Sequence, residues 1–158
     1  MKYIKIGASF QVAENFAEQT QIFGIRIDSD FYKLTKDGIL LVRKGYTWDG
    51  ASGAVDTKSI LKASCIHDIL CELINAGKLA KSYQRTADKH LVEIIGKYWK
   101  WIKANGKWSW KDGQWIEKIK AHLFSPFTTL RRKYIYRAVR IYQANKLTAP
   151  QIKVLEVP

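Results

Sequence analysis

Hydrophobic and polar positions along the first 50 residues follow the short period of β-strands. The segment 23–27 alternates Phe, Ile and Ile with Gly and Arg, which predicts a strand with its three apolar residues on one face. Two further candidate strands, 31–34 and 39–42, flank Thr-Lys-Asp-Gly at 35–38, a sequence typical of a hairpin turn. The pattern of residues 8–20 is ambiguous. We therefore expect antiparallel β-hairpins in this part of the chain.

The apolar period then lengthens to that of a helix. Residues 45–56 are rich in Gly, Ser and Asp, which is typical of an ordered loop. A helix is expected to begin near Ser59, with Asp56 or Thr57 as its N-cap, and to end at Asn-Ala-Gly, residues 75–77. Apolar residues cover much of its surface, which predicts a position in the core. These residues, together with one histidine, are Ile60, Leu61, Ala63, Ile66, His67, Leu70, Leu73 and Ile74.

A second helix is expected from Tyr83 to Lys103, with Ser82 as its N-cap and the Asn-Gly sequence at 105–106 as its end. Because the connection to the first helix is short, the two helices should run antiparallel. The apolar stripe of the second helix consists of Ala87, Leu91, Ile94, Ile95, Tyr98 and either Trp101 or Ile102.

The C-terminal residues are expected to add further helices. A short helix at 115–124 would follow a turn at 112–113, and a last helix would run from Pro126 to about Asn145. The sequence therefore predicts an α+β fold in a single domain, residues 1–158. Its expected parts are a β-rich part with antiparallel hairpins (1–56), an antiparallel core helix pair (57–104) and a basic, Trp-rich helical region (105–158).

The formal net charge of +13 is concentrated near the C-terminus. Residues 1–96 contain 13 Lys/Arg and 11 Asp/Glu, whereas residues 97–158 contain 14 Lys/Arg, 3 Asp/Glu and five of the six Trp. Such a composition suits an anionic surface, either membrane phospholipid or nonspecific nucleic acid. The alternative is a solvated basic face with Trp in the core. The candidate surface residues are Trp99, Trp101, Trp108, Trp110, Arg131, Arg132, Arg137 and Arg140.

Several classes of protein are disfavoured by what the sequence lacks. No apolar run approaches the roughly 20 residues that span a bilayer, and the N-terminal residues do not resemble a signal peptide, so synthesis in a cytoplasm is expected. Cys65 and Cys71 are six residues apart in an expected helix, a rise of about 9 Å, which is too far for a disulfide. Sequence-specific DNA binding is not expected, since there is no helix-turn-helix signature, zinc ligand set or glycine-rich phosphate loop.

Three short motifs carry the candidate chemistry: Trp-Asp-Gly-Ala-Ser at 48–52, Cys-Ile-His-Asp at 65–68 and Arg-Thr-Ala-Asp at 85–88. Adjacent residues of a helix point about 100° apart, so His67 can face the second helix while Asp68 faces the preceding loop. In an antiparallel pair Asp88 then comes level with His67.

A carboxylate bonded to one imidazole nitrogen fixes the tautomer and leaves the other nitrogen as a base. Asp49 and Asp68 can converge on a hard cation such as calcium, with loop carbonyls around Gly50 adding further oxygens, and such a cation would stabilise an oxyanion. The structural alternative is that Asp49 caps a turn, Asp68 is an exposed helix residue and His67 is a hydrogen-bonded core residue.

The three motifs resemble a phage-encoded family, domain of unknown function 1353. That family reads D-x-x-S-x-P, H-D-x-L and R-x-x-A-D-x-x-F; the matches here are Asp49 with Ser52, the sequence at 67–70, and Arg85 to Asp88, with Leu91 at the Phe position. The Pro of the first motif is absent, since Gly53 and Ala54 follow Ser52. The resemblance covers about residues 23–96 and implies a phage origin, with Ser52 and Arg85 as supporting residues.

The helical motifs also resemble the small prokaryotic secreted phospholipase A2 enzymes. That resemblance implies that His67 is the general base for water, that Asp88 orients it, and that Asp49, Asp68 and the Gly50 carbonyl bind Ca²⁺. The departures from this family are the lack of a disulfide framework, the lack of a secretion signal and the β structure before the motifs.

Three functions follow as hypotheses. The first is a calcium-dependent, phospholipase A2-like esterase that acts on phospholipid during phage entry or exit. The second is a non-catalytic phage structural or accessory protein, either a virion component or a host-defence antagonist, made in the host cytoplasm. The third is a nonspecific nucleic-acid binder that uses residues 97–146.

Overall fold

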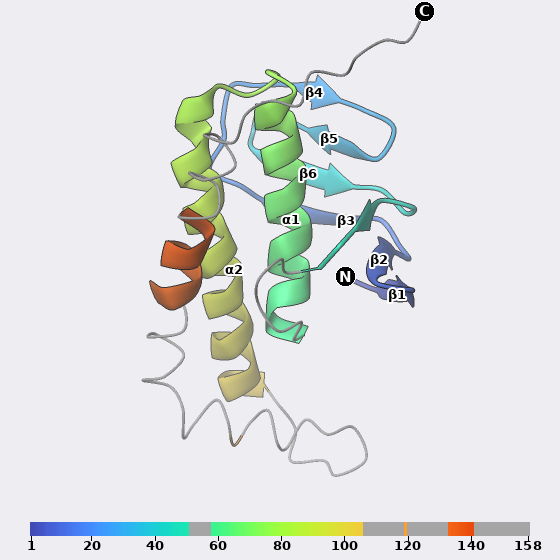
Figure 1. The fold of residues 1–158 in the computed structure, drawn as a ribbon, viewed down its shortest axis with the longest axis vertical. Coiled ribbons are helices and arrows are strands. Elements are labelled where there is room, and N and C mark those ends of the chain that lie inside the picture. Colours follow the sequence, from blue (N-terminus) through green and yellow to red (C-terminus); the bar gives the residue numbers. More distant parts are fainter. Residues whose placement is uncertain (51–57, 106–118, 120–132, 141–158) are drawn as a thin grey trace, which may run out of the picture.

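The computed structural model describes residues 1–50, 58–105, 119 and 133–140. Its N-terminal part consists of short strands that pair antiparallel in two sheets, with the orders β1-β2-β7 and β3-β6-β5-β4 (Figure 1). The strands are β1 (Tyr3–Ile6), β2 (Ser9–Val12), β3 (Phe16–Gln19), β4 (Ile27–Asp28), β5 (Tyr32–Leu34), β6 (Ile39–Val42) and β7 (Thr47–Trp48).

The predicted hairpin at 35–38 is confirmed. β5 and β6 pair in the register Leu34↔Leu40, and both of these leucines are fully buried. The turn is closed by the Thr35 N–H, which donates to the Ile39 carbonyl at 2.9 Å. Gly38 has a φ of 77°, a left-handed conformation that only glycine adopts without strain.

The predicted strand at 23–27 is wrong for most of its length, because β4 begins only at Ile27. Gly24 has a φ of 77° and interrupts the extended backbone, and its N–H donates to the Lys36 carbonyl in place of a strand ladder. Phe23 is 59% exposed as a result. Residues 8–20, whose pattern is ambiguous in the sequence, contain the whole of β2 and β3.

The first helix, α1 (Lys58–Asn75), agrees with the sequence prediction, and every predicted core residue of this helix is buried. It ends as expected: Gly77 has a φ of 69°, and the N–H of Lys78 donates to the carbonyl of Leu73 at 2.9 Å. This arrangement satisfies carbonyl groups that the end of a helix leaves without partners. The proposed caps Asp56 and Thr57 lie outside the described residues.

The second helix, α2 (Gln84–Asn105), follows a short 3₁₀ turn, η1 (Lys81–Tyr83). The prediction that Ser82 caps α2 is wrong, because Ser82 lies inside η1. The chain enters α2 through this 3₁₀ turn, a common feature of helix ends, in which the Tyr83 N–H donates to the Ala80 carbonyl. Of the two alternatives for the end of the apolar stripe, Ile102 is buried at 3% exposure and Trp101 is 54% exposed.

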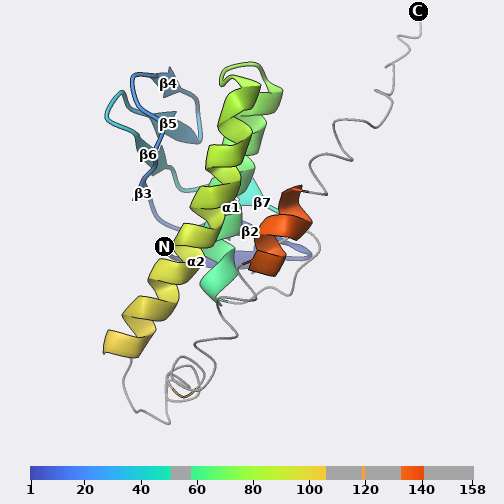
Figure 2. The same ribbon diagram turned by 90° about the vertical axis from the view of Figure 1, so that its left-hand side faces the viewer.

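The elements form layers, with α1 between the sheets and α2 (Figure 1). A further helical segment, 133–140, lies against the helix pair on the side opposite the four-stranded sheet (Figure 2). One cluster of buried residues joins both sheets, α1, α2 and Ile135 of this segment. The α+β fold, with antiparallel strands first and helices after them, is therefore confirmed.

The other elements predicted for the C-terminal region fall mostly outside the residues that the structure describes. The turn at 112–113, most of the short helix at 115–124 and most of the last predicted helix lie outside the described residues. Among the described helices, none has the length and apolar character needed to cross a membrane. Cys65 and Cys71 are both buried thiols that are not joined to each other by a disulfide.

Candidate functional site

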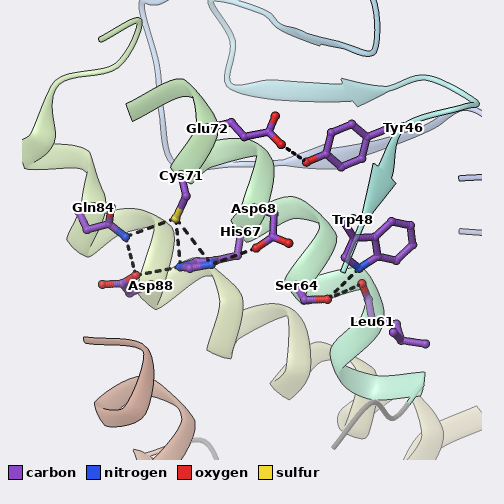
Figure 3. A network of polar contacts seen from close by, with 10 residues as sticks. All are labelled: Tyr46, Trp48, Leu61, Ser64, His67, Asp68, Cys71, Glu72, Gln84 and Asp88. Atoms are coloured by element: carbon purple, nitrogen blue, oxygen red, sulfur yellow. Dashed lines mark hydrogen bonds and ion pairs between the residues drawn. The ribbon is translucent and has the colours of Figure 1, made fainter. Parts of the chain in front are cut away.

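The centre of the candidate site is a buried pair between the two helices, His67 on α1 and Asp88 on α2. The His67 Nε2 and Asp88 Oδ1 atoms lie 2.9 Å apart, and the residues are 6% and 0% exposed (Figure 3). The two helices pack against each other after a short connection, which brings these residues level although 21 positions separate them. The structure thus brings together the two residues to which the sequence assigned a joint role.

Asp88 is held from two further directions. The Gln84 side-chain amide donates to Oδ1 at 2.9 Å, and the Arg140 guanidinium donates to Oδ2 at 3.3 Å. Burial alone would raise the pKa of Asp88, but hydrogen bonds from His67, Gln84 and Arg140 outweigh it and lower the pKa. Asp88 is therefore a carboxylate that three elements of the chain fix in place.

The second ring nitrogen of His67, Nδ1, faces other groups. Asp68 Oδ1 lies 3.9 Å from Nδ1, and the Cys71 Sγ lies 3.7 Å from both ring nitrogens. Burial disfavours a charged imidazole, yet the bonds to Asp68, Asp88 and Cys71 raise the pKa of His67 well above its ordinary value. The surroundings described here therefore favour the imidazolium form, which donates from Nε2 to Asp88.

Asp68 lies on a different face of α1, beside the segment 46–48 that leads to Asp49. Trp48 Nε1 donates to Ser64 Oγ at 3.1 Å, and Tyr46 Oη donates to Glu72 Oε1 at 2.8 Å (Figure 3). Residues four apart share one helix face, so Asp68 lies between these two contacts. The expectation that His67 faces the second helix and Asp68 faces the preceding loop is confirmed.

The predicted calcium ligands Asp49 and Gly50 lie at the end of the described segment 1–50. Asp49 follows β7 directly and is exposed, whereas Gly50 is buried with a φ of 84°. Within the described ranges, no group of three or more His, Cys, Asp or Glu side chains gathers so as to hold a metal ion. The expected set has only two carboxylates, Asp49 and Asp68, with one carbonyl, so Ca²⁺ stays a prediction.

The remaining candidate residues differ in how exposed they are and in what they contact. Arg85 is exposed on α2, and the supporting residue Ser52 lies outside the described residues. Arg140, expected on an anionic-ligand surface, instead bonds Asp88 with a side chain that is 46% exposed. Trp99 packs partly buried against the core, whereas Trp101 and Arg137 are exposed. Trp108, Trp110, Arg131 and Arg132 lie outside the described residues.

Sequence reasoning missed the roles of Gln84, Cys71 and Arg140 in this network. Gln84 and Cys71 could have been found, because each lies four residues from a member of the pair, on the same face of its helix. The Arg140 contact joins residues 52 positions apart and has no local signal.

Comparisons of the chain with protein-family models, with curated proteins and with solved structures found no match. The two resemblances described above therefore stay predictions. The geometry of the His67–Asp88 pair and its neighbours is what supports a function.

Proposed function

We propose that this chain is a hydrolase of ester bonds in which His67 is the general base and Asp88 orients it. The observation that carries the proposal is the 2.9 Å contact between Nε2 and Oδ1 inside a helix pair. A carboxylate bonded at Nε2 keeps the neutral tautomer protonated there, which leaves Nδ1 to take a proton from water. Because Gln84 and Arg140 hold Asp88, the imidazole has a fixed orientation.

The side of the imidazole toward Asp68 is the proposed approach for water and substrate. Asp68 is 33% exposed, whereas the Asp88 side is closed by its three donors. Since Nδ1 is 3.9 Å from the Asp68 carboxylate, a group bound at Asp68 would lie within reach of the base. His67 must lose the proton that its surroundings favour before it can act.

Asp49, Asp68 and the Gly50 carbonyl are the residues proposed to hold Ca²⁺. The Trp48–Ser64 bond fixes the residue before Asp49 one helical turn from Asp68, which supports a shared site. A bound Ca²⁺ ion would stabilise the oxyanion of the attacked ester and, as a neighbouring positive charge, lower the pKa of His67.

A phospholipid ester is the proposed substrate, in keeping with the phospholipase A2-like motifs and a phage-derived protein. The second half of α2 supports contact with an anionic membrane, because Trp101 is exposed together with Lys97, Lys100 and Lys103. Trp can bury its ring at the interface while Lys groups meet anionic headgroups, each contributing about 1 kcal/mol near the surface.

The second candidate function is a non-catalytic phage structural or accessory protein that keeps the fold. The observation that favours it is the near-complete burial of His67 together with the conditions that keep it charged. A buried imidazolium–carboxylate pair can fix the packing of two helices without any reaction.

The test measures fatty acid release from anionic phospholipid vesicles, with and without Ca²⁺, by the wild type, Asp68→Asn and His67→Gln. The control is Asp37→Asn, which removes one carboxylate from the exposed hairpin turn. We expect Ca²⁺-dependent release by the wild type and the control and a loss of at least a hundredfold in both site variants. No release by a folded wild type, or full activity in His67→Gln, would support the non-catalytic alternative.

A further inference from the structure

A cleft of about 380 Å³ opens on the other side of α1 from the His67–Asp88 pair, where the β4–β5 turn and the residues before β7 meet the helix. Its volume falls in the range of small-molecule sites. It is lined by Ser29, Asp30, Phe31, Tyr32, Gly45, Tyr46, Thr47 and Glu72. We propose that this cleft binds an organic ammonium cation, such as the trimethylammonium group of choline.

Three aromatic side chains supply the first part of the argument. The rings of Tyr32 and Tyr46 lie 6.0 Å apart at 77°, so that the edge of one meets the face of the other. The Phe31 ring is 48% exposed and lies over Gly45, where an added Cβ would be 3.4 Å from its Cε1 atom. Aromatic faces attract quaternary ammonium groups, whose methyl groups also gain from leaving water.

Two carboxylates, Asp30 and Glu72, supply the second part. Glu72 accepts the Tyr46 hydroxyl at 2.8 Å, which fixes it at the wall of the cleft. Asp30 is exposed, and no described residue bonds its carboxylate. Burial and the charge of Glu72 both raise the pKa values of Tyr32 and Tyr46, as expected for a region of negative potential.

Two cations near the cleft are already paired with a carboxylate outside its lining. Arg43 and Lys33 both pair with Asp28, at 2.9 and 3.6 Å, and the Arg43 guanidinium also binds the carbonyl groups of Ser29 and Asp30 from outside the cleft lining. Among the described residues, the charged side chains of the cleft lining are two carboxylates, which is a local reversal in a chain of net charge +13. That reversal favours a cationic ligand over the anionic ligands expected elsewhere on this chain.

The aromatic rings distinguish an organic cation from a metal ion. A divalent metal would need several oxygens in a tight shell, whereas within the described residues no metal-holding group of acidic side chains exists. Aromatic rings with carboxylates beside them suit a cation that has an apolar surface. The cleft does not include His67 or Asp88, so the case for this ligand does not rest on the proposed hydrolase activity.

The experiment titrates the full chain with choline and tetramethylammonium, following backbone amide signals by NMR. The variants are Glu72→Gln, which keeps an acceptor for Tyr46, and Phe31→Leu, with Asp37→Asn as the matched control for a lost charge. An uncharged analogue of choline, in which a tert-butyl group replaces the trimethylammonium group, tests whether the charge matters. Melting temperatures establish that each variant is folded.

We expect saturable shifts of the amide signals at the cleft residues. Glu72→Gln and Phe31→Leu should each lose affinity by about fivefold to thirtyfold, which corresponds to the loss of one cation–π or charge contact. The control should bind like the wild type, and the uncharged analogue should bind more weakly than choline. The proposal is overturned if no saturable shift appears, if both variants bind as the wild type does, or if the uncharged analogue binds equally well.

Discussion

Replacing Asp88 by Asn tests whether the buried pair at the helix interface is ionic. The substitution keeps the shape of the side chain but removes the negative charge that His67 and Arg140 share. The new amide N–H₂ group would also face other hydrogen-bond donors, because Gln84 and Arg140 already donate N–H groups to this position. Two cationic groups would then remain without their counter-charge, one of them buried.

The expected loss of stability follows from the burial of each partner. Removing one member of a buried ion pair costs about 3–5 kcal/mol, because the remaining charge has no partner. The lower end applies here, since the Arg140 side chain is 46% exposed and can turn to water. We therefore expect a loss of about 3 kcal/mol, or a fall in Tm of about 6–12 °C for a chain of this size.

The measurement is urea unfolding followed by circular dichroism, with Gln84→Ala as the control that removes one hydrogen bond and costs about 1 kcal/mol. Because the pKa of Asp88 is lowered on folding, its contribution is present above the unfolded value of 3.8 and is lost as the pH falls through the folded value. The gap between wild type and variant should shrink at strongly acid pH. A gap below 1 kcal/mol at pH 7, or one that does not change in acid, would refute the ionic interpretation.

Two further predictions concern other buried polar groups. His90 is 2% exposed, and neither of its ring nitrogens has a hydrogen-bond partner among the residues that the structure describes. Burial lowers its pKa although Glu18 and Glu93 lie 3.8 and 3.7 Å away. The stability that depends on a neutral His90 is present above the unfolded pKa of 6.5 and is lost as the pH falls. Between pH 6.5 and 5, chemical unfolding should therefore show a smaller loss of stability in His90→Gln than in the wild type. An equal loss of stability in the two proteins over this pH range would contradict the prediction. Trp48→Phe removes the bond to Ser64 and should cost about 1–2 kcal/mol in thermal unfolding, and an unchanged Tm would show that the bond contributes nothing.

The elements with strong local signals could be predicted from the sequence. The apolar surface of α1, the Asn-Ala-Gly stop and the hairpin turn at 35–38 all appear where they were expected. The misplaced strand at 23–27 has a specific cause, since alternation alone cannot reveal that Gly24 adopts a left-handed conformation. The start of α2 was predicted one residue too early, because the chain before Gln84 forms a 3₁₀ turn rather than the first turn of the α-helix.

The candidate site was predictable to the extent that it depends on helix geometry. The different directions of His67 and Asp68, about 100° apart, and the level position of Asp88 follow from 3.6 residues per turn and a short connection. The Arg140 contact depends on how a distant segment packs, which no local pattern contains. The cleft was missed for the same reason, because Phe31, Tyr46 and Glu72 come from three separate segments.

The Asp68 carboxylate couples the two proposed sites through α1. It lies 3.9 Å from His67 Nδ1, and its charge contributes to the raised pKa of Tyr46, whose ring lines the cleft. Asp68 is also one helical turn from Glu72, a rise of about 6 Å, at which two charges in a water-like medium interact by about 0.7 kcal/mol. Neutralising Asp68 should therefore weaken binding of an ammonium cation without touching the cleft.

The variant Asp68→Asn tests this coupling in the choline titration, where we expect about a twofold to threefold loss of affinity. Added Ca²⁺ should have the same effect on the wild type if it binds at Asp68, and by linkage choline should weaken Ca²⁺ binding by the same factor. Calcium that leaves choline affinity unchanged, while Asp68→Asn lowers it, would place any calcium site away from Asp68. An unchanged affinity in Asp68→Asn would instead mean that solvent screens the two sites from each other.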